Sequence, residues 1–355
     1  MDILIKNGKV WSGEKFFYSD IFISNKKIEK IEQKIVSDAD FTYDATGKIV
    51  SPGLVDIHTH LSGISTKFFG THPELSCVPF GVCNAIDGCA IKGNSEFADS
   101  FLLKTKVFAP FGIKNNHIET DVAEKMISAY GDKLLGVKVC FDVAQCDAKD
   151  VTPLMEAREF AKKHNLKVMV HTTGSPTSMT EVADCLEKGD IISHPFHGGE
   201  NNSSENGFEA LKKAKEKGII IDSSFAGHVH TDFGILKDAV SLGILPDTVS
   251  TDITCRSAYI RGGRYGMTMC MSILKTLGMS EEDIFRASTK VPGQIFDSTG
   301  NTGVIEVGAN ADISVFEYGC QPYSLTDNWS GNTVSDENGY ICDMTVINGE
   351  IVYRR

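Results

Sequence analysis

The sequence has no apolar run near the roughly 20 residues that a helix needs to cross a bilayer. Its opening stretch, MDILIKNGKVW, lacks the apolar core of a signal peptide. Basic residues are also scarce: 35 Lys and Arg stand against 47 Asp and Glu, for a formal net charge of −12. Because nucleic acids and anionic membranes are bound through basic surfaces, we expect neither partner and predict a cytoplasmic protein.

Two motifs are missing as well. The ten cysteines include no CxxC pair, and the six-residue spacing of Cys77, Cys83 and Cys89 matches no common zinc motif. We expect most of the cysteines to be small buried apolar residues of a reduced protein. No glycine-rich dinucleotide fingerprint is present either, which disfavours the doubly wound open sheet as the fold.

Both ends of the chain read as short strands. ILIKNGKVW predicts a strand, a turn at Asn7-Gly8 and a second strand, and IFISNKKIEKIEQKI predicts a hairpin that turns at Ser24-Asn25. GVIEVGANADISVFEY and MTVINGEIVYRR are similar, with the polar segment Gln321–Asn338 expected to be a solvated loop. Since isolated hairpins are only marginally stable, we predict that residues 1–52 and 304–355 pair into one small β-domain.

The middle of the chain alternates eight short apolar segments with stretches of helical length: LVDIH, VCNAID, KVFAP, GVKVCF, KVMVHT, IISHPFH, IIIDSS and TVSTD. Thr152-Pro153 opens one expected helix as N-cap residue and first-turn proline. Eight strands alternating with helices over about 250 residues predict an α/β fold, a (β/α)8 TIM barrel over residues 53–303.

Polar residues interrupt these apolar strands at or near their carboxyl ends, where a barrel carries its active site. Each of them alone is compatible with a hydrogen-bonded structural residue or, for the lysine, with a solvated head group. Five strands carry one at once, and a convergent group of imidazoles, an amine and a carboxylate would be costly without a metal. The residues are His58, His60, Lys138, His171, His194 and Asp252.

These six residues predict a two-metal site. A buried lysine becomes a neutral amine, which can add carbon dioxide to give a carbamate that bridges two cations. One ion would take His58, His60 and Asp252, the other His171 and His194, with carbamylated Lys138 between them. Ligands of this kind suit Zn²⁺, with Mn²⁺ or Fe²⁺ as alternatives.

The same residues resemble the amidohydrolase superfamily over nearly the whole chain. GLVDIHTH (53–60), the strand lysine, the two later histidines and the aspartate in STDIT carry the resemblance. GVKV around Lys138 and SHPFHG around His194 are most similar to the dihydroorotase-like deacetylase branch, whose members hydrolyse N-acyl amino acids or acylated hydroxy acids such as acetyl-mandelate. Dihydroorotases place an arginine two residues after the second histidine, where this chain has Ser62.

The resemblance therefore implies a metal-dependent hydrolase that cleaves a linear acyl amide or ester of a small molecule by attack of a metal-bridging hydroxide. Asp252 would act as general base and then acid. The alternatives are a cyclic-amide hydrolase of the dihydroorotase or hydantoinase kind and a non-catalytic scaffold with the same barrel; a deaminase is less favoured because deaminases generally use one metal. The sequence leaves open whether the protein forms a homo-oligomer.

Candidate substrate contacts lie in the loops beyond the strands. His197, His228 and Arg256 are the three candidates, the arginine as a clamp for a substrate carboxylate, a role that Arg261 and Arg264 could also fill. Each of them could instead be a structural or solvated residue. His230 and His72 are expected to be solvated loop residues.

Overall fold

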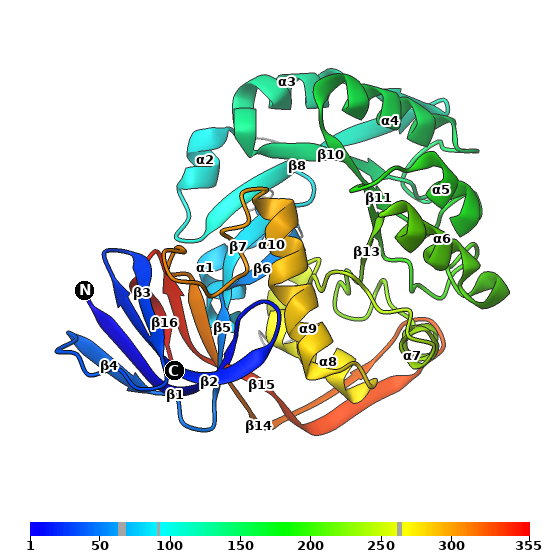
Figure 1. Cartoon of the computed structure of the whole chain (residues 1–355). Helices are drawn as coiled ribbons and strands as arrows, with labels where there is room; N and C mark the ends of the chain where they lie inside the picture. The colour runs from blue at the N-terminus through cyan, green and yellow to red at the C-terminus, as the bar shows by residue number, and fades with distance from the viewer. Residues whose placement is uncertain (63–68, 91–92, 261–264) are drawn as a thin grey trace.

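The computed structural model describes residues 1–62, 69–90, 93–260 and 265–355, whose strands form two sheets (Figure 1). The first sheet contains β1 (Ile3–Trp11), β2 (Phe16–Ser24), β3 (Lys27–Glu32), β4 (Phe41–Asp44), β5 (Ile49–Pro52), β14 (Ile313–Thr326), β15 (Thr333–Ile347) and β16 (Glu350–Arg354). The second contains β6 (Leu54–Thr59), β7 (Val82–Asp87), β8 (Lys104–Lys114), β9 (His117–Glu119), β10 (Leu134–Cys140), β11 (Lys167–His171), β12 (Ile191–Ser193) and β13 (Ile220–Asp222).

The first sheet joins the two ends of the chain, in the order β16-β15-β14-β5-β1-β2-β3 with β4 beside β1. β5 pairs with β14 and so links the segments, because neither half could bury its apolar face alone. One detail differs from the sequence prediction: β1 runs through Asn7 without turning. The left-handed backbone of Asn7 (φ 60°) instead makes a bulge against β2.

The polar segment Gln321–Asn338 is not a solvated loop, and that prediction is wrong. It lies in a long hairpin of β14 and β15, which pair from Ile313 and Val346 out to Thr326 and Thr333 with two shifts of register on the way. In Figure 1 this hairpin, coloured orange to red, leaves the small sheet and reaches α7 on the far side of the molecule. Its strands are polar because they extend away from the core of the small sheet.

The second sheet is the predicted barrel. Its strands run in parallel in the order β13-β12-β11-β10-β8-β7-β6, with β9 as an antiparallel addition to β8. The eighth predicted segment closes it, since Thr248 bridges to Asp222 of β13 and Ile253 bridges to Thr59 of β6. The predicted fold class is confirmed. The exact limits of the two domains stay a prediction.

Ten α-helices are described, and several of them cover the outside of the barrel (Figure 1). They are α1 (Pro73–Ser76), α2 (Ser95–Asp99), α3 (Asp121–Tyr130), α4 (Thr152–His164), α5 (Met179–Cys185), α6 (Glu209–Lys217), α7 (Phe233–Ser241), α8 (Met267–Thr276), α9 (Glu281–Ser288) and α10 (Lys290–Phe296). The predicted helix at Thr152-Pro153 is α4, but Thr152 is its first helical residue rather than its cap. The Asp150 carboxylate accepts the Thr152 N–H instead. None of the described helices has the length and apolar character needed to cross a membrane.

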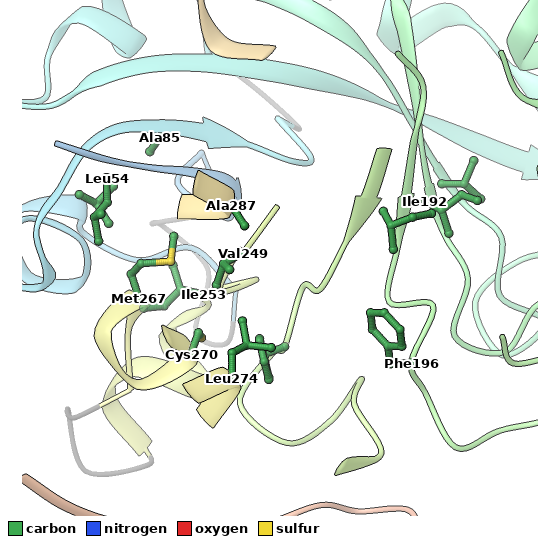
Figure 2. Packing of buried hydrophobic residues seen from close by; sticks show 14 of the residues in the cluster. Leu54, Ala85, Ile192, Phe196, Val249, Ile253, Met267, Cys270, Leu274 and Ala287 are labelled. Carbon is green, nitrogen blue, oxygen red and sulfur yellow. The ribbon is translucent and has the colours of Figure 1, made fainter. Parts of the chain in front are cut away.

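The largest apolar cluster binds strands to helices, and Figure 2 shows Leu54 and Ile253 of the barrel wall packed near Met267 and Leu274 of α8. A smaller cluster joins Val55 of β6 to Met169 of β11. Because these two strands are not neighbours in the sheet, that cluster fills the barrel interior below the strand ends. The cysteines are less buried than expected: all ten are free, four are buried, and Cys320 is exposed.

Candidate metal centre

The carboxyl ends of the barrel strands open into a pocket of about 840 Å³. All six residues predicted as metal ligands line it: His58, His60, Lys138, His171, His194 and Asp252. Their side chains are buried or nearly so, with Lys138 only 4 % exposed. The tertiary structure thus brings together residues that are up to 194 positions apart in the chain.

Asp252 lies at the centre of the group. Its Oδ1 atom is 2.7 Å from Nε2 of His60 and 3.6 Å from Nε2 of His58. Its Oδ2 atom is 3.8 Å from Nε2 of His194 and 3.8 Å from Nε2 of His230. One carboxylate therefore faces four imidazoles, an arrangement in which a carboxylate and histidines can share a cation.

The hydrogen bonds around His194 leave one of its ring nitrogens available to a ligand. Its Nδ1–H donates to the backbone carbonyl of Ser224 at 2.7 Å, because a carbonyl can only accept. The other nitrogen, Nε2, is then left with its lone pair, and it is buried without a hydrogen-bond partner among the described atoms. Histidine ligands of metals are held in this way in general.

His58 is fixed by a polar network behind it. Its Nδ1 atom lies 2.5 Å from Oγ of Ser224 and 3.7 Å from the carboxylate of Asp222. Asp222 in turn accepts hydrogen bonds from Ser250 and Thr248, each at 2.8 Å. These contacts orient His58 toward the pocket.

A glycine beside His58 and the backbone conformations of two other residues also shape the site. A Cβ atom at Gly88 would lie 2.5 Å from Cδ2 of His58, so only glycine leaves this ring in place. His194 (φ 64°) and Asp252 (φ 48°) both have left-handed backbone, a conformation that costs about 1–3 kcal/mol in a residue other than glycine. Strain of this kind is concentrated at functional sites.

Burial sets the protonation states. It lowers the pKa of His58 to about 4, with the neighbouring Lys138 adding to the effect, and it lowers the pKa of Lys138 itself. Burial and the nearby His230 hold the pKa values of His171 and His194 well below the ordinary range. Burial alone would raise the pKa of Asp252, but the histidines around it outweigh this and lower it.

These shifts favour the neutral imidazole, the neutral amine and the ionised carboxylate, which are the forms that bind divalent cations. Two sets of side chains have donor atoms within 4.8 Å of one another: His58, His194 and Asp252, and His171, His194 and His230. Buried ring nitrogens of His60, His171, His194 and His230 lack hydrogen-bond partners among the described atoms. The donor set fits metal ions, which would satisfy nitrogens that are otherwise costly to bury.

These observations match a known family. The family model described as "Amidohydrolase family" matches residues 123–352. The chain belongs to the amidohydrolase family. The hydrolase prediction and the superfamily resemblance made from the sequence are thereby confirmed.

Among the relatives of this amidohydrolase is a protein named deacetylase from Enterococcus faecalis, which is 27% identical over 371 residues and covers 99% of this chain and 98% of its own length. Two solved structures show the same fold. One, titled an adenine deaminase, has a TM-score of 0.87 at 24% identity and covers 100% of both chains. The other, titled a dihydroorotase, has a TM-score of 0.82 at 23% identity and covers 98% of both chains.

The candidate substrate contacts of this amidohydrolase divide into two groups. His228 and Arg256 line the pocket, and Arg256 is exposed with no ion-pair partner among the described residues. His197 is not among the described residues that line it: its ring is fully buried, its Nδ1 atom accepts the Gly199 N–H, and the Trp329 ring lies 6.1 Å away. Arg261 and Arg264 lie outside the described residues.

Sequence reasoning missed two residues of the site. His230 is not a solvated loop residue as predicted, because it is partly buried among His171, His194 and Asp252. The His228-Val229-His230 spacing repeats that of His58 and His60 and could have signalled this.

His72 is exposed as expected and pairs with Glu74. Asn328 lines the pocket from the β14–β15 hairpin, and no sequence motif marks it.

Proposed function

We propose that this amidohydrolase cleaves a linear acyl amide or ester, such as an N-acyl amino acid or an acylated hydroxy acid, at a centre of two divalent metal ions. The single observation that carries the proposal is the convergence of the six predicted ligands in one pocket, where buried ring nitrogens have no hydrogen-bond partner within the described part of the chain. A scaffold without catalytic function would have no reason to bury such a group.

In the proposed centre His58, His60 and Asp252 would hold one ion, and His171 and His194 would hold the other. Lys138, carbamylated at Nζ, would supply a carboxylate ligand, and its burial and lowered pKa favour the neutral amine that carbamylation requires. The nitrogen and oxygen donors suit Zn²⁺, with Mn²⁺ or Fe²⁺ as alternatives. When bound, the ions polarise the substrate carbonyl and lower the pKa of the attacking water.

Asp252 moves the proton. Its carboxylate is ionised at neutral pH and takes the proton of the attacking water, then passes it from an Oδ atom to the leaving nitrogen or oxygen. Its backbone N–H donates a hydrogen bond to the carbonyl of His58 at 2.8 Å. Together with the left-handed backbone conformation, this bond holds the carboxylate in place beside the other candidate ligands.

The position of Arg256 favours an amino acid or a hydroxy acid as the part of the substrate that carries a carboxylate. Its guanidinium is exposed on the pocket wall without a carboxylate partner among the described residues. Arginine binds carboxylates through two parallel hydrogen bonds, so a substrate carboxylate is a fitting partner. The deacetylase name of the Enterococcus faecalis relative agrees with an acyl substrate.

The test is a hydrolysis screen of metal-loaded protein on N-acyl L- and D-amino acids, acylated hydroxy acids and cyclic amides. We expect acid release from one of the linear classes, and the preferred enantiomer will define stereochemistry. Activity confined to cyclic amides would replace the proposal with a dihydroorotase- or hydantoinase-type hydrolase. A protein that retains less than one divalent ion per chain after reconstitution would overturn the metal centre.

A further inference from the structure

The tip of the β14–β15 hairpin, residues 327–332, lies at the candidate active site although both strands belong to the small sheet. Asn328 lines the same pocket as Arg256 and His228. A peripheral sheet thus contributes to a site otherwise built from barrel loops, and the hairpin in Figure 1 spans the distance between them.

The tip is a turn organised by one buried carboxylate. Oδ1 of Asp327 accepts the backbone N–H groups of Trp329, Ser330 and Gly331 at 2.8–2.9 Å. Oδ2 accepts the N–H of Phe233, the first residue of α7, at 3.1 Å. Asp327 is only 5 % exposed and its hydrogen bond to Phe233 is buried, so this carboxylate fixes the tip to the barrel.

A second carboxylate joins the same two elements from the other side. Asp232, the N-cap of α7, accepts hydrogen bonds from the hydroxyl of Ser330 and from the side-chain amide of Asn332. The hairpin tip is therefore docked against the start of α7 through both Asp327 and Asp232.

Trp329 connects the tip to the loop that carries two pocket histidines. Its indole N–H donates to the carbonyl of Val229 at 2.9 Å, and the N–H of Asn328 donates to the carbonyl of His228 at 3.3 Å. Val229 stands between His228 and His230, which both face the pocket. Two hydrogen bonds thus hold the backbone of this loop from the hairpin side.

The indole ring rests on Gly198, and the contact requires glycine there. A Cβ atom at Gly198 would lie 2.5 Å from Cβ and 2.7 Å from Cγ of Trp329. The ring also approaches the buried His197. The tip is packed between two barrel loops, those that follow β12 and β13.

We propose that the hairpin tip forms the part of the pocket wall that determines substrate specificity. Two of its residues have separate roles. Trp329 is a positioning residue that holds the His228–His230 loop, and the side-chain amide of Asn328 binds the part of the substrate remote from the scissile bond. The substrate role of Asn328 rests on the proposed function. It implies that the leaving amino acid or hydroxy acid carries a polar group that binds the Asn328 amide, in addition to the carboxylate that binds Arg256.

The positioning role is tested without any substrate, by hydrogen–deuterium exchange of Trp329→Phe. This variant keeps an aromatic ring on Gly198 but lacks the N–H that bonds Val229. We expect amide exchange in residues 226–232 to rise by about fivefold, the scale of one lost hydrogen bond. The matched control is Thr333→Ala, which removes a cross-strand hydroxyl contact with Thr326 in the same hairpin and should leave that loop unchanged.

Unchanged exchange in Trp329→Phe overturns the positioning role. A second variant, Gly198→Ala, disturbs the packing of Trp329 from the barrel side. If its thermal unfolding shows a folded protein, it should give the same increase in amide exchange in residues 226–232. Equal increases across the whole chain in either variant would mean general destabilisation and also overturn it.

The binding role is tested by Asn328→Ala with the best acyl substrate of the screen. We expect KM to rise about tenfold, which corresponds to ~1.4 kcal/mol, with kcat within about twofold and metal content unchanged. An unchanged KM overturns this role. If no acyl compound is hydrolysed at all, the proposed function and with it the substrate role of Asn328 fail, while the exchange result still decides the role of Trp329.

Discussion

The amine of Lys138 lies 3.2 Å from Nε2 of His58, inside the barrel and almost out of reach of solvent. At this distance two positive charges would repel each other strongly, so the amine and the imidazole cannot both be protonated. Burial lowers the pKa of both groups, and the neighbouring Lys138 lowers that of His58 further. The lone pairs of the neutral amine and the neutral imidazole, the forms that burial favours, can bind a divalent cation.

Replacing Lys138 with alanine should lower the metal affinity by at least about 100-fold and abolish hydrolysis, since the centre loses its proposed shared ligand. Metal analysis after dialysis measures the first effect and substrate turnover the second. Reconstitution of the natural protein should also depend on bicarbonate, which supplies the carbamate.

Lys167 provides the control for this experiment. It begins β11 at the opposite end of the barrel and is exposed. Lys167→Ala should bind two ions and turn over normally. Near-normal rates in Lys138→Ala would show that the two-metal centre is wrong.

Asp252→Asn should separate proton transfer from metal binding. The amide cannot take a proton from water, so we expect kcat to fall by about 10²- to 10⁴-fold, the usual contribution of a general base. The metal content should be largely retained, because the histidines and Lys138 remain. Asp247→Asn, at the surface beside Lys215, should leave both quantities unchanged; turnover preserved in Asp252→Asn would rule out its catalytic role.

Arg256→Gln should act on binding of the substrate carboxylate. A hydrogen bond to a charged group contributes about 1.5–3 kcal/mol, so KM for carboxylate substrates should rise by roughly 10- to 150-fold while kcat changes little. Amide analogues of the same substrates, which lack the charge, should show no such rise. Arg286→Gln, whose partner Asp283 lies on the helix surface, is the control. A parallel loss on charged and neutral substrates would contradict the clamp.

Acid stability should depend on the buried His197. Burial, together with the nearby His230, lowers its pKa to about 4 in the folded protein, against an ordinary value of 6.5. Between these values the unfolded chain binds more protons than the folded chain, so this contribution to stability is complete above about pH 6.5 and is lost as the pH falls toward 4.

The variant His197→Asn, which can still accept the Gly199 N–H, should lose less stability on acidification. Between pH 7 and pH 5 we expect its free energy of unfolding to fall by about 2 kcal/mol less than that of the natural protein. Denaturant unfolding of metal-free protein at the two pH values measures this. The exposed His117→Asn is the comparison variant, and equal losses in all three proteins would refute the assignment.

The sequence by itself determined the barrel, the pairing of the two chain ends and the group of candidate ligands. These follow from local patterns: apolar strands at regular intervals, and polar residues such as His58, His171 and Asp252 where an apolar strand should end. Since parallel strands of a barrel end at one rim, positions along single strands were enough to infer a common site.

The tertiary structure alone decided what lines the rest of the pocket. His197 and His230 both occur in loops after strands, yet His197 is fully buried away from the pocket lining and His230 lies among the candidate ligands, because the course of a loop depends on packing against distant segments. The polar stretch around Asn328 looks like a solvated loop in sequence, and its place at the site comes from buried contacts of Asp327 with α7. No local pattern encodes such contacts, since the partners lie about 100 residues apart.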